Sequence, residues 1–184
     1  ATPTQAPPEV VATEAPAPEA TAVPPAEPFR VAVVMPSSIA DLAFSQSMYD
    51  ALLAVQEEMG GAENFEIAYS EGMFVIEDAA AAIRDYASQG FDLVIANAEN
   101  AADGAGLTAR LATRLLDCGA DVLTTGNHVW RHSDLVPLLE MSERVLRPAN
   151  LGGVGAPGRG LTVVAASSGP LIAVINLQGG LFMD

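Results

Sequence analysis

Residues 91–100, FDLVIANAEN, begin as an apolar strand pattern and end in polar side chains. Residues 121–128, DVLTTGNH, repeat this arrangement after one intervening helical pattern at 107–118. Short apolar runs rich in Val, Ile and Leu are typical of strands that are buried on both faces of a sheet. Because a single helix separates the two runs, we expect a strand-helix-strand unit whose strands are parallel neighbours.

The same alternation continues on both sides of this unit. Further strands are expected at 30–35, 65–69, 161–166 and 171–177, and further helices at 44–59, 76–89 and 133–141. Gly60-Gly61, Gly90 and Gly119 stand where helices should end, as a left-handed cap requires. The sequence SSGP at 167–170 predicts a hairpin between the last two strands. The predicted fold is therefore α/β, with a mostly parallel sheet, helices on both faces and a mixed or antiparallel C-terminal edge.

The first 28 residues have a different composition. They hold 8 of the 13 prolines and no Lys or Arg, which predicts a disordered Pro/Ala-rich tether. The whole chain has 23 acidic and 8 basic residues, a net charge of -15 that disfavours a nucleic-acid polymer as partner. No apolar run reaches the roughly 18 residues of a membrane span, so no transmembrane segment is expected.

Polar side chains follow two strands that should lie side by side. Glu99 and Asn100 come after the first, and Asn127 and His128 after the second. At the carboxyl edge of a parallel sheet these groups would converge, and oxygen ligands with an imidazole suit Mn, Fe or Zn. The alternative is structural, because Asn and Glu often cap helices and a Gly-Asn pair often makes a turn. Spacing alone leaves both interpretations open.

Five motifs in residues 93–184 carry a resemblance to a known family. They are ENAADGAGLT at 99–108, TTGNHVW at 124–130, LRPAN at 146–150, PGRG at 157–160 and VINLQG at 174–179. In this order and spacing they resemble the YmdB-like metallophosphoesterases, which belong to the calcineurin-like type and hydrolyse phosphodiesters such as cyclic nucleotides. The resemblance implies a small phosphodiester ligand and a cytoplasmic location.

The resemblance also implies roles for individual residues. Glu99, Asn100 and Asn127 would be ligands of a divalent metal pair (Mn, Fe or Zn), and His128 would donate a proton to the leaving oxygen. In the family the first strand ends in Gly-Asp, whose aspartate is a ligand, whereas here it ends in Met35-Pro36-Ser37. Three histidine ligands of the family would lie beyond residue 184. With four of eight groups present, we expect an incomplete site, which can leave the chain inactive.

Residues 29–92 resemble a different family. FRVAVVMP at 29–36 and DLAFSQSMYD at 41–50 are similar to the start of the BMP-family (basic membrane protein) substrate-binding lipoproteins of ABC importers. This resemblance implies a purine nucleoside ligand, an ABC permease as partner and a membrane-anchored, extracytoplasmic location. Asp41 would hydrogen-bond the ligand, Phe44 would stack on its base, and Ser45 stands where the family has a ribose-contacting Asn. Alternatively, Asp41 caps a helix, and Phe44, Met48 and Leu52, which recur at helical spacing, belong to the core.

The two resemblances meet at 91–97, where both families have an apolar strand. The predicted organisation is a linker at 1–28, a BMP-like portion at 29–92 and an incomplete YmdB-like portion at 93–184. A junction inside a shared strand predicts a chimera or a fragment. It also predicts a foldable chain, since a buried parallel strand followed by a helix suits either neighbour.

Overall fold

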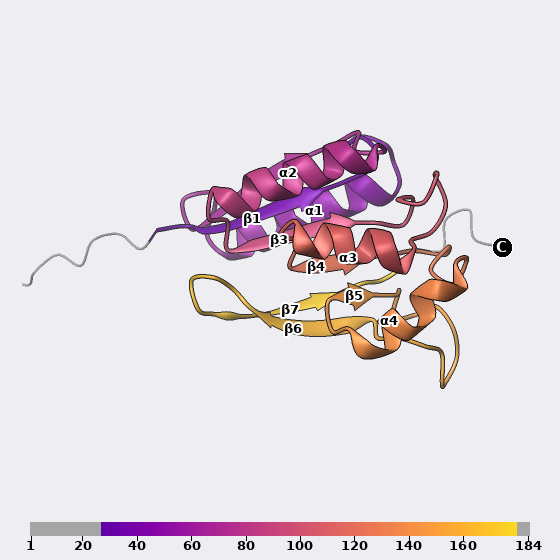
Figure 1. The fold of residues 1–184 in the computed structure, drawn as a ribbon. Coiled ribbons are helices and arrows are strands. Elements are labelled where there is room, and N and C mark those ends of the chain that lie inside the picture. The colour runs from indigo at the N-terminus through magenta and orange to yellow at the C-terminus, as the bar shows by residue number, and fades with distance from the viewer. Residues whose placement is uncertain (1–26, 180–184) are drawn as a thin grey trace, which may run out of the picture.

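A parallel five-stranded sheet forms the centre of the chain, in the order β2-β1-β3-β4-β5 (Figure 1). The computed structural model describes residues 27–179, so nearly all of the predicted tether lies outside the described residues. The strands of this sheet are β1 (Phe29–Val34), β2 (Phe65–Ser70), β3 (Leu93–Asn97), β4 (Val122–Thr124) and β5 (Val145–Leu146). The helices are α1 (Phe44–Glu58), α2 (Ile76–Ser88), α3 (Ala109–Asp117), the 3-10 turn η1 (Ser133–Leu135) and α4 (Val136–Met141).

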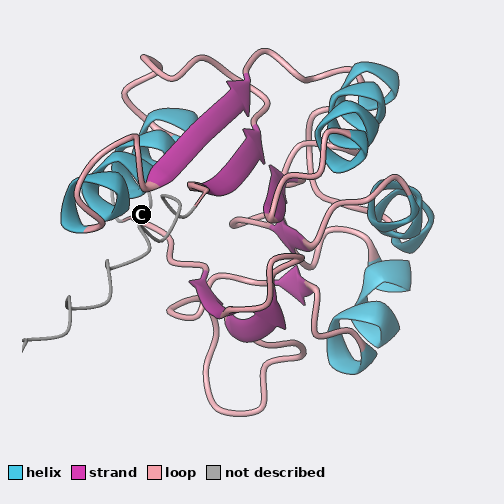
Figure 2. Cartoon of the chain, turned by 90° about the vertical axis from the view of Figure 1, so that its left-hand side faces the viewer, coloured by secondary structure: helices cyan, strands magenta, loops and turns pink. Residues whose placement is uncertain are grey.

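Successive side chains of each strand point to opposite faces of the sheet. Leu93 and Ile95 pack toward α1, whereas Val94 and Ala96 pack toward α2, α3 and α4. Figure 2, which looks along the sheet from the N-terminal side of Figure 1, shows helices on both of its faces. This confirms the α/β prediction, including the helices on both faces. The predicted helix ends are confirmed too, since Gly60, Gly90 and Gly119 have φ values of 92°, 71° and 109°.

The portions before and after the shared strand form one sheet. β1 lies between β2 and β3, and Val31 is the register partner of Leu93. The Arg30 amide donates to the Asp92 carboxylate (2.8 Å), and the Asp92 amide donates to the Arg30 carbonyl (2.9 Å). Residues 91–97, where the junction was predicted, therefore lie in the middle of the core and pack against elements on both sides.

The C-terminal strands, β6 (Leu161–Ala165) and β7 (Leu171–Ile175), form a separate antiparallel hairpin. Its inner side, with Val164, Ile172 and Val174, packs against the same face of the large sheet as α1. Its outer side is apolar and open to solvent. The predicted hairpin is confirmed. Among the helices of residues 27–179, none is both long and apolar enough to span a membrane.

Candidate functional site

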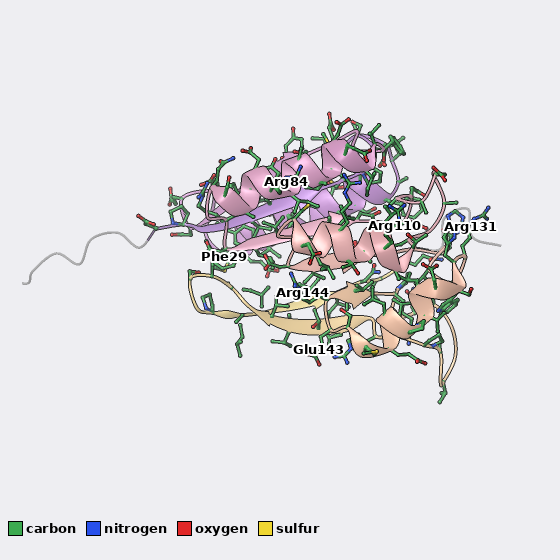
Figure 3. All side chains as sticks on the ribbon, in the orientation of Figure 1. Phe29, Arg84, Arg110, Arg131, Glu143 and Arg144 are labelled. Carbon is green, nitrogen blue, oxygen red and sulfur yellow. The ribbon has the colours of Figure 1, made fainter. Side chains whose placement is uncertain are left out.

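The tips of β3 and β4 are direct neighbours, as the sequence predicted. Asn97 pairs with Thr124 in parallel register, and the Ala98 amide donates to the Thr124 carbonyl at 2.9 Å. The residues that follow each strand therefore start from the same edge of the sheet. In Figure 3 this is the end marked by Arg131, which lies in the turn after β4, at the opposite end from Phe29 at the start of β1.

Glu99 has an unusual environment for a carboxylate. Its residue is only 2% exposed, and no donor among the described residues bonds either side-chain oxygen. The carboxylate lies against Gly126, where a Cβ would overlap its carbon and both of its oxygens. A buried, unpaired charge is costly, and a glycine is the one residue that leaves room for it here. Glu99 is therefore not a helix cap, and Gly126 does more than make a turn.

The loop after β3 is folded tightly around Glu99. The Gly106 amide donates to the Glu99 carbonyl (2.6 Å), and the Asn97 side-chain oxygen accepts from the Glu99 amide (3.2 Å). Gly106 has a φ of 81°, and a Cβ on it would lie 3.1 Å from the His128 carbonyl oxygen. The loops after β3 and β4 thus pack on each other, which fixes Glu99 relative to the turn after β4.

The turn after β4 carries two further candidates, Asn127 and His128. The Val129 amide donates to the Gly126 carbonyl (3.1 Å), which closes the turn over Asn127 and His128. Asn127 is exposed, and His128 is half-buried with its Nδ1 atom buried and unpaired among the described residues. The structure therefore brings an unpaired carboxylate, an exposed amide and an unpaired imidazole nitrogen to adjacent strand tips.

A family model with the description YmdB-like protein matches residues 66–184. The chain belongs to this family. The YmdB-like match includes β3, β4 and the whole candidate site, and it begins within β2, ahead of the predicted junction at 91–97.

Two relatives can be compared with this YmdB-like chain. A 2',3'-cyclic-nucleotide 2'-phosphodiesterase of Bacillus subtilis (strain 168) is 44% identical over 89 residues, which cover 48% of this chain and 33% of that protein. A crystal structure of a hypothetical protein from Thermus thermophilus superposes with a TM-score of 0.53 at 38% identity, covering 59% of this chain and 42% of the other. The matched part therefore spans about a third of the curated relative's length.

Asn100 is placed differently from the other candidates. It is half-buried and lines a hollow of about 20 Å³ between the ends of β1 and β3, together with Val34, Pro36 and Asn97. Its neighbour Glu99 faces β4 instead. Within residues 27–179, no group of three or more His, Cys, Asp or Glu side chains is arranged to hold a metal ion. The candidate site thus has one carboxylate and one imidazole, and its other donors are amides.

Asp41 is a structural residue at the start of α1. Its carboxylate accepts hydrogen bonds from the amides of Ala43 (2.8 Å), Ser45 (3.2 Å) and Gln46 (3.1 Å), and from the Ser37 hydroxyl. Partial burial disfavours the charged form, but these four hydrogen bonds outweigh it, and the pKa of Asp41 lies below its ordinary value. Ser45 and Gln46 lie in the first turn of α1, whose N-cap position is Ala43, so the Asp41 side chain caps the helix from two residues before that position.

Ser45 and Phe44 lie beside this cap. Ser45 is fully buried. The Ser37 amide donates to its hydroxyl oxygen (3.2 Å), which also lies 2.8 Å from the Ser37 hydroxyl. Phe44 is 45% exposed, so it does not join the half-buried Met48 and Leu52 in the core. The alternative that placed Phe44 in the core is therefore wrong. A nucleoside site at Asp41, Phe44 and Ser45 stays a prediction.

Two features of the site were not recognised in the sequence. One is the structural requirement for glycine at position 126, where any side chain would overlap the carboxylate of Glu99. The other is Asn176, a buried amide that bonds the end of β4. The signal for Asn176 was a polar residue within the apolar run at 171–177.

Proposed function

We propose that the adjacent tips of β3 and β4 form part of the metal site of a phosphodiester hydrolase. The observation that carries this proposal is the carboxylate of Glu99, which is buried, unpaired and packed against Gly126. A protein accepts the cost of a buried carboxylate when a cation or donor compensates for it. Because no donor among residues 27–179 does so, a cation is the natural partner.

The residues present fit part of a divalent metal site. Glu99 would be the charged ligand and Asn127 a second oxygen ligand. Asn100, which lines the hollow between the ends of β1 and β3, would contribute an oxygen from that side. This donor set with an imidazole suits Mn, Fe or Zn. Two bound metal ions would neutralise charge on the phosphoryl group and activate a water molecule. Four groups are few for a dinuclear site, so we expect weak metal binding by residues 27–179.

His128 would act on the leaving group. It lies in the turn that the bond from the Val129 amide to the Gly126 carbonyl closes, and its Nδ1 has no hydrogen-bond partner among the described residues. An imidazole held this way can give a proton to the departing oxygen. The substrate class follows from the Bacillus subtilis relative, whose name specifies a 2',3'-cyclic nucleotide. We therefore propose a small phosphodiester such as a cyclic nucleotide.

The test is hydrolysis of bis-p-nitrophenyl phosphate by the full chain with added Mn²⁺ or Fe²⁺. We expect metal-dependent turnover that falls at least about 100-fold in His128→Ala, the usual size of a general-acid effect. His132→Gln is the matched control, because His132 donates to the Ala105 carbonyl (3.1 Å) and Gln can keep that bond. Turnover that is independent of metal, or equal in His128→Ala and the wild type, would remove the proposal.

Metal binding is tested separately from turnover. Titration with Mn²⁺, followed by electron paramagnetic resonance, should show binding to the wild type and loss of it in Glu99→Gln. The Gln side chain is nearly isosteric but carries no charge. Equal affinity in both proteins would show that Glu99 is not a ligand.

A further inference from the structure

Asn176 connects the C-terminal hairpin to the candidate site. It directly follows β7, is 9% exposed, and lies 51 residues after Thr125 in the sequence. Its side-chain amide nitrogen donates to the Thr125 carbonyl at 2.7 Å and to the Leu146 carbonyl at 3.1 Å. Both hydrogens of one buried amide are thus used on the ends of two neighbouring strands, β4 and β5.

The main chain of Asn176 is held equally firmly. Its amide donates to the Gly160 carbonyl (2.9 Å), and its carbonyl accepts from the Ala149 amide (2.8 Å). Gly160 itself is a point of close approach, since a Cβ there would overlap the main chain of Ala149. These contacts fix the position of the Asn176 main chain. The side-chain amide therefore presents its two N–H donors to the sheet from a fixed position.

The Thr125 carbonyl is the last main-chain carbonyl before Gly126, Asn127 and His128. The other bonds of Thr125, from its amide (3.0 Å) and its hydroxyl (2.8 Å), both go to the Leu146 carbonyl and tie β4 to β5 without fixing the next peptide unit. The bond from Asn176 fixes the peptide that leads into the turn. We propose that Asn176 is a positioning residue that sets the direction of the Gly126–Asn127–His128 turn. Its catalytic meaning rests on the proposed metal site.

The test measures amide hydrogen exchange by NMR in the full chain without metal. The reporters are the Thr125 and Val129 amides, which are bonded on either side of the turn, and the Met35 amide, which bonds the Ser70 carbonyl (2.9 Å) at the end of β1. In Asn176→Leu the buried Thr125 carbonyl loses its side-chain donor, while the Leu146 carbonyl keeps only its bonds from Thr125. Exchange at Thr125 and Val129 should therefore be at least about tenfold faster. Exchange at Met35 should change less than about threefold.

Two further variants separate positioning from general support. In Asn176→Asp the introduced carboxyl is buried against two carbonyl oxygens, which favours its protonated form. The protonated acid can donate one hydrogen bond, whereas the carboxylate can donate none. Exchange at Thr125, relative to the wild type at the same pH, should therefore be much closer to normal at pH 5 than at pH 7. Asn150→Ala removes the exposed Asn150–Gln178 pair (2.7 and 2.9 Å), which anchors the same segment without contacting Thr125. It should leave Thr125 exchange unchanged.

The outcomes distinguish this inference from the proposed function. Unchanged exchange at Thr125 and Val129 in Asn176→Leu would overturn the positioning role, and so would equal acceleration at all three amides in both Asn176 variants. If the wild type binds Mn²⁺, Asn176→Leu should weaken binding about tenfold or more, and undiminished affinity would also overturn it. A wild type without Mn²⁺ binding removes the metal site, while the exchange data still decide whether Asn176 holds the turn.

Discussion

The carboxylate of Glu99 and the main chain of Gly126 are in contact across the tips of two parallel strands. A side chain of any size on Gly126 would displace this carboxylate. Because the carboxylate is buried and has no donor among the described residues, its position depends on this contact and on the loop that carries it. The contact therefore affects both the stability of the folded chain and the geometry of the proposed metal site.

Gly126→Ala should disturb both. Overfilling a packed site typically costs about 1 to 3 kcal/mol, and here it also moves Glu99 away from β4. We expect the free energy of unfolding in urea to fall by that amount and Mn²⁺ binding to be lost. Gly153→Ala is the control, since a Cβ there would meet no atom within 4 Å. An equal effect of the two substitutions would show that Gly126 has no special role.

Glu99→Gln should stabilise the metal-free chain or leave its stability unchanged. The substitution removes a buried charge, which lowers the stability of the folded chain. Functional sites often contain groups that lower stability in this way. We expect a free energy of unfolding in EDTA at least equal to that of the wild type, but no increase on addition of Mn²⁺. Glu143→Gln is the comparison, because Glu143 is exposed and forms a surface ion pair with Arg159 (2.7 Å) that should contribute at most about 1 kcal/mol. A Glu99→Gln chain that is clearly less stable in EDTA would indicate a structural role for the carboxylate.

The Asp41 cap should make stability depend on pH. The pKa of Asp41 is lower in the folded chain than the ordinary 3.8. The stabilisation that its carboxylate gives is therefore complete well above pH 3.8 and is lost as the pH falls through the folded-state pKa. Asp41→Ala should cost about 0.5 to 2 kcal/mol at pH 7, measured by urea unfolding, and the cost should shrink at an acidic pH below 3.8. The exposed Asp50 of α1 is the control, and Asp50→Ala should change stability by less than about 0.5 kcal/mol at either pH. A cost of Asp41→Ala that stays constant as the pH is lowered well below 3.8 would contradict the capping role.

Arg147→Lys should loosen the loop between β5 and β6. The guanidinium donates to the carbonyls of Gly158 (3.1 Å), Pro148 (2.8 Å) and Leu151 (3.0 Å), a set that a single ammonium group cannot reproduce. We expect faster limited proteolysis within 148–159 and a loss of about 1 kcal/mol in unfolding free energy. Arg110→Lys, at an exposed arginine of α3 (Figure 3), should leave the proteolysis rate unchanged. Equal rates for wild type and Arg147→Lys would exclude this role.

Local patterns were sufficient to predict most of the secondary structure. The alternating strand and helix runs, the capping glycines and the hairpin at 161–175 are all found, because each depends on nearby dihedral preferences and on which side chains need burial. β5 was not predicted. It has only two residues. It exists because the Arg144 carbonyl accepts a bond from Leu123 on β4 (2.7 Å) and the Leu146 carbonyl accepts one from Thr125, which directly follows β4 (3.0 Å).

The sequence alone determined the α/β fold and the meeting of Glu99, Asn127 and His128 at one sheet edge, since parallel strands in a strand-helix-strand unit end on the same side. Only the tertiary structure decided that Glu99 faces Gly126, that Asn100 turns toward β1, and that Asn176 bonds Thr125 across 51 residues. These contacts join segments distant in sequence. Their geometry depends on how whole elements pack, and no local pattern of residues specifies it.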